Sequence, residues 1–239
     1  MNYVTQCINK DIASADRTSE TITNSLYEYL STSDLVTKFF DVSEVIYDNE
    51  NSRYYMKLIP IAENLNDTYI WIYADSSYMY VKYKDTNNTI DIMGSLSINY
   101  DLYVNICCDE SQIKISITAS SSSTTTTSFN KFFMITSVKS NTGEVSPVLL
   151  FTNGQNDYLN VILNKSTYKL SFGTEGGNIN DNSGYVLLRK YSLITQNGYT
   201  LSFDKVYTVF GASSLPIRFT VNNKEYFGFA KLNICALFN

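Results

Sequence analysis

The chain has 239 residues, of which 44% are hydrophobic and 17% are charged, so it can build a core beneath a polar but largely neutral surface. Its formal net charge is -5, and its 18 basic residues form no cluster along the chain, which excludes the Lys and Arg stripe that a nucleic-acid partner needs. It contains no histidine, which excludes Ser-His-Asp and Cys-His catalytic sets and the usual zinc ligands.

The first predicted element is an amphipathic helical segment near the start of the chain. Apolar side chains recur there at every fourth position, at Ile22, Leu26 and Leu30, which is typical of a helix with one buried face. Hydroxyl side chains precede both this helix and a shorter one after it, where they can cap the helix starts. We therefore predict that residues 1–41 form an N-terminal helical segment packed on the rest of the chain.

From residue 42 onward, apolar and polar side chains alternate, as they do in strands. The runs 68–74 and 78–84 alternate in this way, and Asp75-Ser76-Ser77 between them is typical of a hairpin turn. Further runs follow, separated by turns rich in Asn, Asp and Gly: 89–94, 96–106, 112–118, 131–139, 147–152, 158–163, 168–173, 185–194, 200–210, 217–221 and 225–238. Short strands at this spacing predict a mainly β fold, an antiparallel β-sandwich over residues 42–239.

A low-complexity run, ASSSSTTTTSF, occupies residues 119–129 between two predicted strands. It lacks the Gly or Pro of a flexible linker, and both of its flanks have the same strand-like character. We interpret it as a long polar hairpin loop. A division of the β region into two subdomains near 119–130 stays open.

No segment predicts catalysis, a metal site or a cofactor. The glycine- and asparagine-rich run 173–184 lacks the glycine and glutamate spacing of an EF-hand and has no phosphate-loop motif, so a surface loop is favoured. Paired carboxylates such as Asp109-Glu110 fall in predicted turns, where acidic residues are common. We expect no enzyme activity.

The aromatic residues of the hairpin at 68–84 form the candidate site. If its two strands pair, one side of the sheet carries what we call the aromatic face: Tyr69, Trp71, Tyr73, Tyr78 and Tyr80. Such side chains suit protein interfaces and stacking on sugars, because they combine apolar area with a hydrogen-bonding tip. The alternative is that the N-terminal helix covers this face with its apolar stripe. We favour the alternative, since that stripe has to be buried somewhere.

Three features together resemble virion structural proteins of tailed bacteriophages and of phage-tail-like particles, in particular tail and baseplate components. The first is the opening helix SLYEYLSTSDLVTKFF (25–40), followed at once by alternating strands such as YYMKLIP (54–60) and YIWIYAD (69–75). The second is the β body rich in Tyr, Asn, Ser and Thr, and the third is the closing hairpin LPIRFTVNNKEYFGFAKLNICALF (215–238).

This resemblance implies a non-enzymatic assembly part that docks on other tail or baseplate proteins and on copies of itself, and that is located in the particle. The opening residues contain no apolar run of the kind a signal peptide has, so we expect synthesis in the cytoplasm of a bacterial host. No apolar stretch reaches the length of a membrane span, so we expect no membrane partner. The competing hypothesis is a receptor- or glycan-binding module, such as a tail-fibre tip or an adhesin that binds a host surface glycan.

Overall fold

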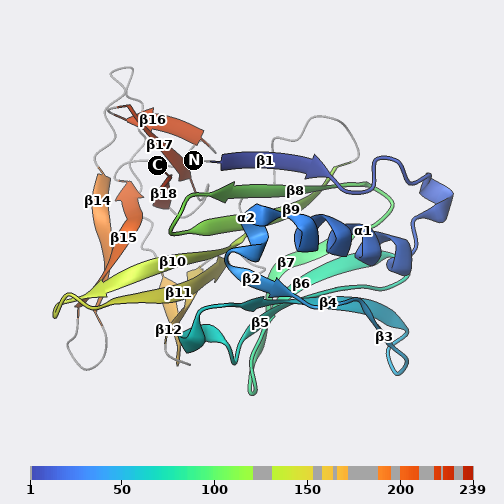
Figure 1. Cartoon of the computed structure of the whole chain (residues 1–239), viewed down its shortest axis with the longest axis horizontal. Coiled ribbons are helices and arrows are strands. Elements are labelled where there is room, and N and C mark those ends of the chain that lie inside the picture. Colours follow the sequence, from blue (N-terminus) through green and yellow to red (C-terminus); the bar gives the residue numbers. More distant parts are fainter. Residues whose placement is uncertain are drawn as a thin grey trace.

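The structure is a computed structural model of the whole chain (Figure 1). It describes residues 2–120, 131–152, 158–163, 166–171, 188–194, 200–209, 218–221, 223–228 and 234–238. Antiparallel strands dominate these residues and belong to two sheets, which confirms the prediction of a mainly β, antiparallel chain. Within the described residues, none of the helices has the length and apolar character needed to cross a lipid bilayer.

The smaller sheet carries the candidate site. In the described residues it has six strands in the order β2-β4-β5-β6-β7, with β3 also paired to β4. Its strands are β2 (Phe40–Val42), β3 (Ile46–Asp48), β4 (Arg53–Pro60), β5 (Tyr69–Ala74), β6 (Tyr78–Lys84) and β7 (Thr89–Ser97). The predicted hairpin at 68–84 is confirmed as β5 and β6. The Asp75 carboxylate fixes its turn by accepting hydrogen bonds from the backbone N–H groups of Ser77 and Tyr78, both at 2.8 Å.

The larger sheet has twelve strands in the described residues. They are β1 (Asn2–Cys7), β8 (Asp101–Cys108), β9 (Ile113–Ser120), β10 (Phe133–Ser140), β11 (Val145–Thr152), β12 (Tyr158–Leu163), β13 (Ser166–Ser171), β14 (Leu188–Ile194), β15 (Thr200–Val209), β16 (Arg218–Val221), β17 (Lys224–Gly228) and β18 (Ile234–Phe238). Strands β8 to β13 follow one another as a meander, and β15 joins them to β18. The large sheet therefore continues from its centre into the C-terminal strands.

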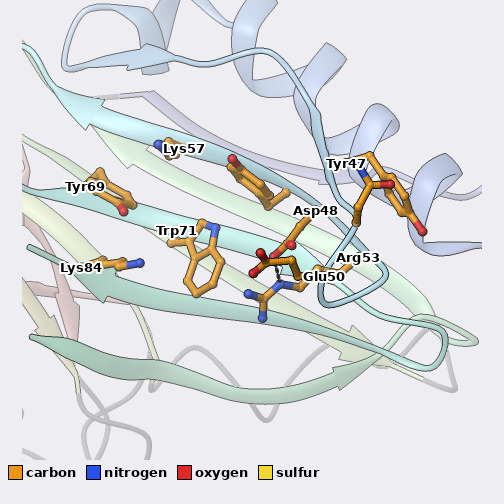
Figure 2. A pocket seen from close by; sticks show the side chains of 10 residues that line it. Tyr47, Asp48, Glu50, Arg53, Lys57, Tyr69, Trp71 and Lys84 are labelled. Carbon is orange, nitrogen blue, oxygen red and sulfur yellow. Dashed lines mark hydrogen bonds and ion pairs between the residues drawn. The ribbon is translucent and has the colours of Figure 1, made fainter.

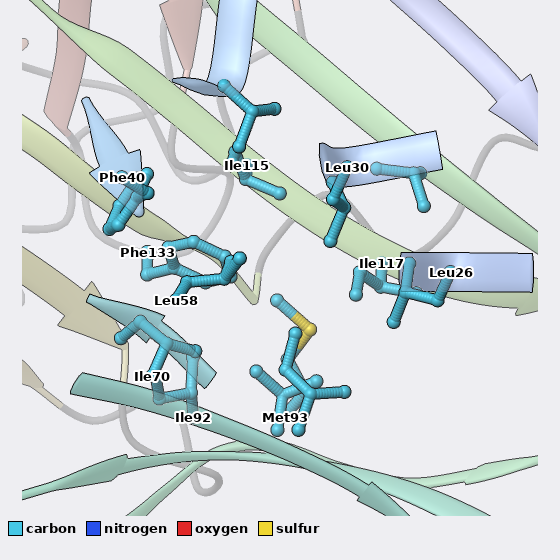
Figure 3. Packing of buried hydrophobic residues seen from close by; sticks show 14 of the residues in the cluster. Leu26, Leu30, Phe40, Leu58, Ile70, Ile92, Met93, Ile115, Ile117 and Phe133 are labelled. Atoms are coloured by element: carbon cyan, nitrogen blue, oxygen red, sulfur yellow. The ribbon is translucent and has the colours of Figure 1, made fainter. Parts of the chain in front are cut away.

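The main hydrophobic core lies between the two sheets (Figure 3). Two ring contacts join them directly: Phe40 of β2 meets Phe133 of β10 edge-on at 5.8 Å, and Tyr83 of β6 stacks on Phe151 of β11 at 4.7 Å. Successive residues of β10 alternate between this core and a second cluster, which contains Met134. Since the first half of β10 is buried on both faces, its first three residues, Phe133, Met134 and Ile135, are all apolar.

The N-terminal helices are α1 (Ser19–Thr32) and α2 (Asp34–Thr37), accompanied by short 3-10 turns at Ser14–Asp16 and Glu63–Leu65. Thr18 caps α1 through a hydrogen bond that its hydroxyl accepts from the backbone N–H of Thr21 at 3.2 Å. The range 1–41 also contains β1, which pairs with β8 and was not predicted. Its residues are exposed on both faces, so they show no alternation of apolar and polar side chains.

The expectation that the helix covers the aromatic face is wrong. Helix α1 packs on β4 and β5 (Figure 1), but its buried residues Leu26 and Leu30 share the main core with Ile70 and Ile72. Those two isoleucines project from the face of β5 opposite to Trp71, because neighbouring residues of a strand point to opposite sides. The helix therefore fills the interior side of the small sheet and leaves the aromatic face uncovered.

Two predicted strands are divided differently in the structure. The run 96–106 is interrupted, because β7 continues to Ser97 and a turn precedes β8. The run 225–238 is two paired strands, β17 and β18. Strands β9 and β10, which flank the Ser/Thr run, pair with each other, with Ile115 opposite Phe133. Residues 121–129 of that run and the run 173–184 lie outside the described residues, and the subdivision near 119–130 stays a prediction.

Candidate functional site

The aromatic face lies on the outer side of the small sheet. Along β5, Ile70 and Ile72 are fully buried, whereas Tyr69 and Trp71, which alternate with them, are half-buried, and Tyr73 on the same side as Trp71 is only 8% exposed. Along β6 the same alternation leaves Tyr80 half-buried and Tyr78 43% exposed. The two-residue period of the paired strands places all five predicted residues on one face, where Tyr73 lies between the rings of Trp71 and Tyr80.

Four of the five predicted residues form a continuous row of ring contacts. The centroids of Trp71 and Tyr73 lie 4.6 Å apart, and Tyr73 stacks on Tyr80 across the strand pair at 4.8 Å with an interplanar angle of 17°. Tyr78 extends the row by an edge contact with Tyr80 at 6.5 Å. Tyr69 belongs to the same face but contacts a lysine rather than another of these rings. Aromatic pairs of this kind stabilise a sheet surface beyond the burial of their area.

Strand β4 adds residues that the sequence analysis missed. Tyr55 meets the edge of Trp71 at 6.1 Å, and the guanidinium of Arg53 lies over the Trp71 ring, with Cζ 4.5 Å from the ring centroid. Lys57 lies opposite Trp71 in the strand register, and its Nζ is 4.9 Å from the centroid of Tyr69. The signal was present in RYYMKLIP (53–60), where these three residues alternate with buried Met56, Leu58 and Pro60.

Lysines of β6 complete a mixed aromatic and cationic surface. The Nζ of Lys84 lies 4.9 Å from the centroid of Trp71, and that of Lys82 lies 5.6 Å from the centroid of Tyr73. Cations at these distances from ring faces are attracted by the negative potential of the π system. The sequence has no basic cluster, yet the pairing of β4, β5 and β6 brings the cations Arg53, Lys57, Lys82 and Lys84 onto one face.

These cations differ in whether a carboxylate neutralises them. Arg53 donates from Nε to Asp48 at 3.0 Å, and Lys82 pairs with Asp91 at 3.0 Å. A hydrogen bond from Asn51 and the one from Arg53 hold the pKa of Asp48 below its ordinary value. Burial would lower the pKa of Lys82, but the hydrogen bonds and charge interactions with Asp91 and Tyr73 together outweigh burial and raise it. In the described part of the chain, Lys57 and Lys84 have no carboxylate within ion-pair distance.

A hollow of about 550 Å³ opens on this face, and we call it the Trp71 hollow (Figure 2). Its sides are formed by three aromatic residues of β4 and β5 and by three cations: Tyr55, Tyr69, Trp71, Arg53, Lys57 and Lys84. Residues 47–50, from β3 and the turn after it, form its rim. Figure 2 shows Tyr69 and Trp71 lying between Lys57 on one side and Lys84 on the other. The arrangement can hold a ligand by ring stacking, by hydrogen bonds and by charge.

Of the pair Asp109-Glu110, Asp109 makes contacts that stabilise the fold, and Glu110 is exposed. The Asp109 carboxylate is almost completely buried and accepts a hydrogen bond from Lys205 Nζ at 2.7 Å, which ties β8 to β15. It also accepts a hydrogen bond from the backbone N–H of Ser111 at 2.8 Å. In the residues that the structure describes, no group of three or more His, Cys, Asp and Glu side chains is placed to hold a metal ion.

Comparisons with protein-family models, with curated proteins and with solved structures find no match to this chain. The functional argument therefore starts from the aromatic face and the Trp71 hollow. Both are built mainly on β4, β5 and β6 of one sheet, a rigid support on which side chains keep fixed relative positions, and β3 adds the rim of the hollow.

Proposed function

We propose that this chain is a non-enzymatic structural protein of a phage tail or phage-tail-like particle. Its two facing sheets form a β-sandwich, and the aromatic face docks on a neighbouring tail or baseplate protein, which includes the option of another copy of the chain. In this proposal the protein resides in the particle and acts by binding, without chemistry.

One observation carries the proposal: a continuous row of aromatic rings lies on the outer side of the small sheet, uncovered by the helix that packs on its inner side. Interfaces between proteins concentrate their binding energy in a few Trp, Tyr and Arg side chains. The face offers Trp71, several tyrosines and Arg53 within one patch. A stable contact there would bury about 1,200–2,000 Å² in total.

The test is incorporation of variants into the particle. Tyr78 and Tyr100 are matched, since they are 43% and 47% exposed, but only Tyr78 belongs to the aromatic face. We expect Tyr78→Ala and Trp71→Ala to reduce incorporation, and Tyr100→Ala to leave it unchanged. Unfolding curves of the isolated variants identify any loss that is due to folding. Normal incorporation of folded Tyr78→Ala and Trp71→Ala would show that the face is not the docking surface.

A second candidate function is recognition of a host surface glycan, and the Trp71 hollow favours it. Its described lining consists of aromatic rings and polar or charged side chains, with no Leu, Ile, Val, Met or Phe. Sugar rings stack on Trp and Tyr and exchange hydrogen bonds with polar neighbours. The isolated protein should then bind particular polysaccharides saturably on a glycan array, whereas an assembly part should bind none.

A further inference from the structure

We infer that the Trp71 hollow is an anion-binding site for an acidic carbohydrate, a sugar chain that carries carboxylate or phosphate groups. This inference rests on the second candidate function, glycan recognition, and names the ligand class for that site. It assigns separate roles to the rings, which contact the sugar, and to Lys57 and Lys84, which contact its anionic groups.

The position of the two lysines is the first argument. In the strand register Lys57 lies opposite Trp71 on one side of β5, and Lys84 lies opposite Tyr69 on the other side. The strands that carry them, β4 and β6, are two strand spacings apart, about 10 Å. Side chains as long as lysine reach across that distance, so one anionic group above Tyr69 and Trp71 can contact both ammonium groups.

The charge left over after pairing is the second argument. The described lining holds the cations Arg53, Lys57 and Lys84 and the carboxylates Asp48 and Glu50. Asp48 already neutralises Arg53, and Glu50 lies exposed at the rim. Two lysines therefore face the hollow against one peripheral carboxylate, although the whole chain carries a net charge of -5. The charge of these two lysines faces the hollow, where it attracts an anion of matching size.

The rings also hold the lysines in place before a ligand arrives. Lys57 Nζ lies 4.9 Å from the Tyr69 centroid, and Lys84 Nζ lies 4.9 Å from the Trp71 centroid. A cation held over a ring loses less side-chain freedom when it then binds an anion, so the site is partly organised in advance.

A sugar fits the remaining lining better than a protein segment or a nucleic acid. A protein anchor usually fills an apolar pocket, and the described lining contains no aliphatic side chain. A nucleic-acid strand needs a row of unpaired cations along its phosphates. Here Asp48 neutralises Arg53 and Asp91 neutralises Lys82, so the four cations do not form such a row.

The 239-residue chain provides its own probe, because Trp71 is its single tryptophan. Its fluorescence is followed while oligogalacturonate, phosphomannan, neutral dextran, poly-glutamate and an oligothymidylate are titrated in separate experiments. We expect saturable changes with oligogalacturonate or phosphomannan, which distinguish a carboxylate ligand from a phosphate ligand. Dextran, poly-glutamate and oligothymidylate should bind at least tenfold more weakly.

Two double variants compare the lysines of the hollow with two lysines elsewhere on the surface. Lys57→Gln with Lys84→Gln should weaken binding of the acidic sugar by about tenfold or more, because two charge-assisted contacts are lost. Lys10→Gln with Lys139→Gln changes the net charge equally at two exposed positions away from the hollow and should leave binding unchanged. Calorimetric titration provides a readout that does not depend on the Trp71 spectrum, and unfolding curves confirm that each variant folds.

Each other outcome overturns the inference in a recognisable way. Equal binding of dextran and oligogalacturonate would leave glycan recognition standing but remove the role of charge. Equal binding of poly-glutamate or oligothymidylate would show a general attraction for polyanions. Binding of none of the probes would remove this inference, while glycan recognition would still be judged by the glycan array and the assembly function by particle incorporation.

Discussion

The guanidinium of Arg53 lies over the ring of Trp71, with Cζ 4.5 Å from the ring centroid, while its Nε donates to the Asp48 carboxylate at 3.0 Å. The same guanidinium lies 4.6 Å from the centroid of Tyr73. Arg53 therefore connects the β3–β4 hairpin to two rings of β5. This contact sets the position of the rim of the Trp71 hollow relative to its aromatic side.

Replacing Arg53 should loosen this corner of the sheet. Arg53→Ala removes two cation–π contacts and a partly exposed ion pair, so we expect the free energy of unfolding to fall by about 1–2 kcal/mol. Denaturation in urea, followed by circular dichroism, measures the change. Lys139→Ala, at an exposed position of β10, is the control and should change it by less than about 0.5 kcal/mol. Equal effects of the two variants would mean that the Arg53 contacts contribute nothing.

The stack of Tyr73 on Tyr80 should appear as a coupling energy. In a double-mutant cycle with alanine at both positions, the pair is expected to be coupled by about 0.5–1.5 kcal/mol, because the rings are directly opposite and nearly parallel. Tyr73 and Phe203, which belongs to the second cluster, should give additive effects within about 0.5 kcal/mol. Additivity of Tyr73 and Tyr80 would show that the stack does not form in solution.

The packing of α1 on the inner side of the small sheet can be tested with two residues of the helix. Leu26 is fully buried in the main core and Glu28 is exposed. Leu26→Ala should lower the free energy of unfolding by about 2–5 kcal/mol, since it leaves a cavity between helix and sheet. Glu28→Ala should lower it by less than about 0.5 kcal/mol. Similar small losses in both variants would contradict the docked helix.

The ion pair between Asp109 and Lys205 should make stability depend on acid pH. Burial would raise the pKa of Asp109, but hydrogen bonds from Lys205 and Ser111 outweigh it and hold the pKa below the ordinary 3.8. A carboxyl with a lowered folded-state pKa stabilises the fold above its unfolded-state pKa, and that contribution disappears as pH falls through the folded value. The wild-type protein should therefore lose stability as pH falls below about 4.

Asp109→Asn should remove part of this acid dependence and lower stability at pH 7 by about 1.5–3 kcal/mol, the contribution of a hydrogen bond to a charged group. Glu110→Gln, at the exposed neighbouring position, is the matched control and should retain the acid dependence. Both effects are measured by urea unfolding at several pH values. An Asp109→Asn variant with the wild-type acid profile would rule out a role of this pair.

The sequence predicts the β5–β6 hairpin because its evidence is local. Alternation fixes which residues share a face, and Asp75 fixes the turn, so the five aromatic residues could be grouped without a structure. The position of α1 could not be predicted in the same way. The stripe at Leu26 and Leu30 shows that the helix has a buried side, but not which face of which sheet covers it.

The cations of the site could be predicted only in part for a related reason. Lys82 and Lys84 share the outward face of β6 with Tyr78 and Tyr80 and are visible in the hairpin itself. Arg53 and Lys57 lie on β4, whose place beside β5 and whose register follow from long-range pairing. A shift of one residue in that register would turn both side chains into the core, so their contact with Trp71 depends on the three-dimensional fold.

The most direct test of the central claim, that Trp71 lies on an outward cationic face, is quenching of its fluorescence by iodide and by caesium. Trp71 is the single tryptophan, so the signal comes from this site without other contributions. We predict that iodide quenches Trp71 more strongly than caesium, and that Lys57→Gln with Lys84→Gln reduces the difference. If neither ion quenches Trp71, as expected for a ring buried beneath α1, the account is contradicted.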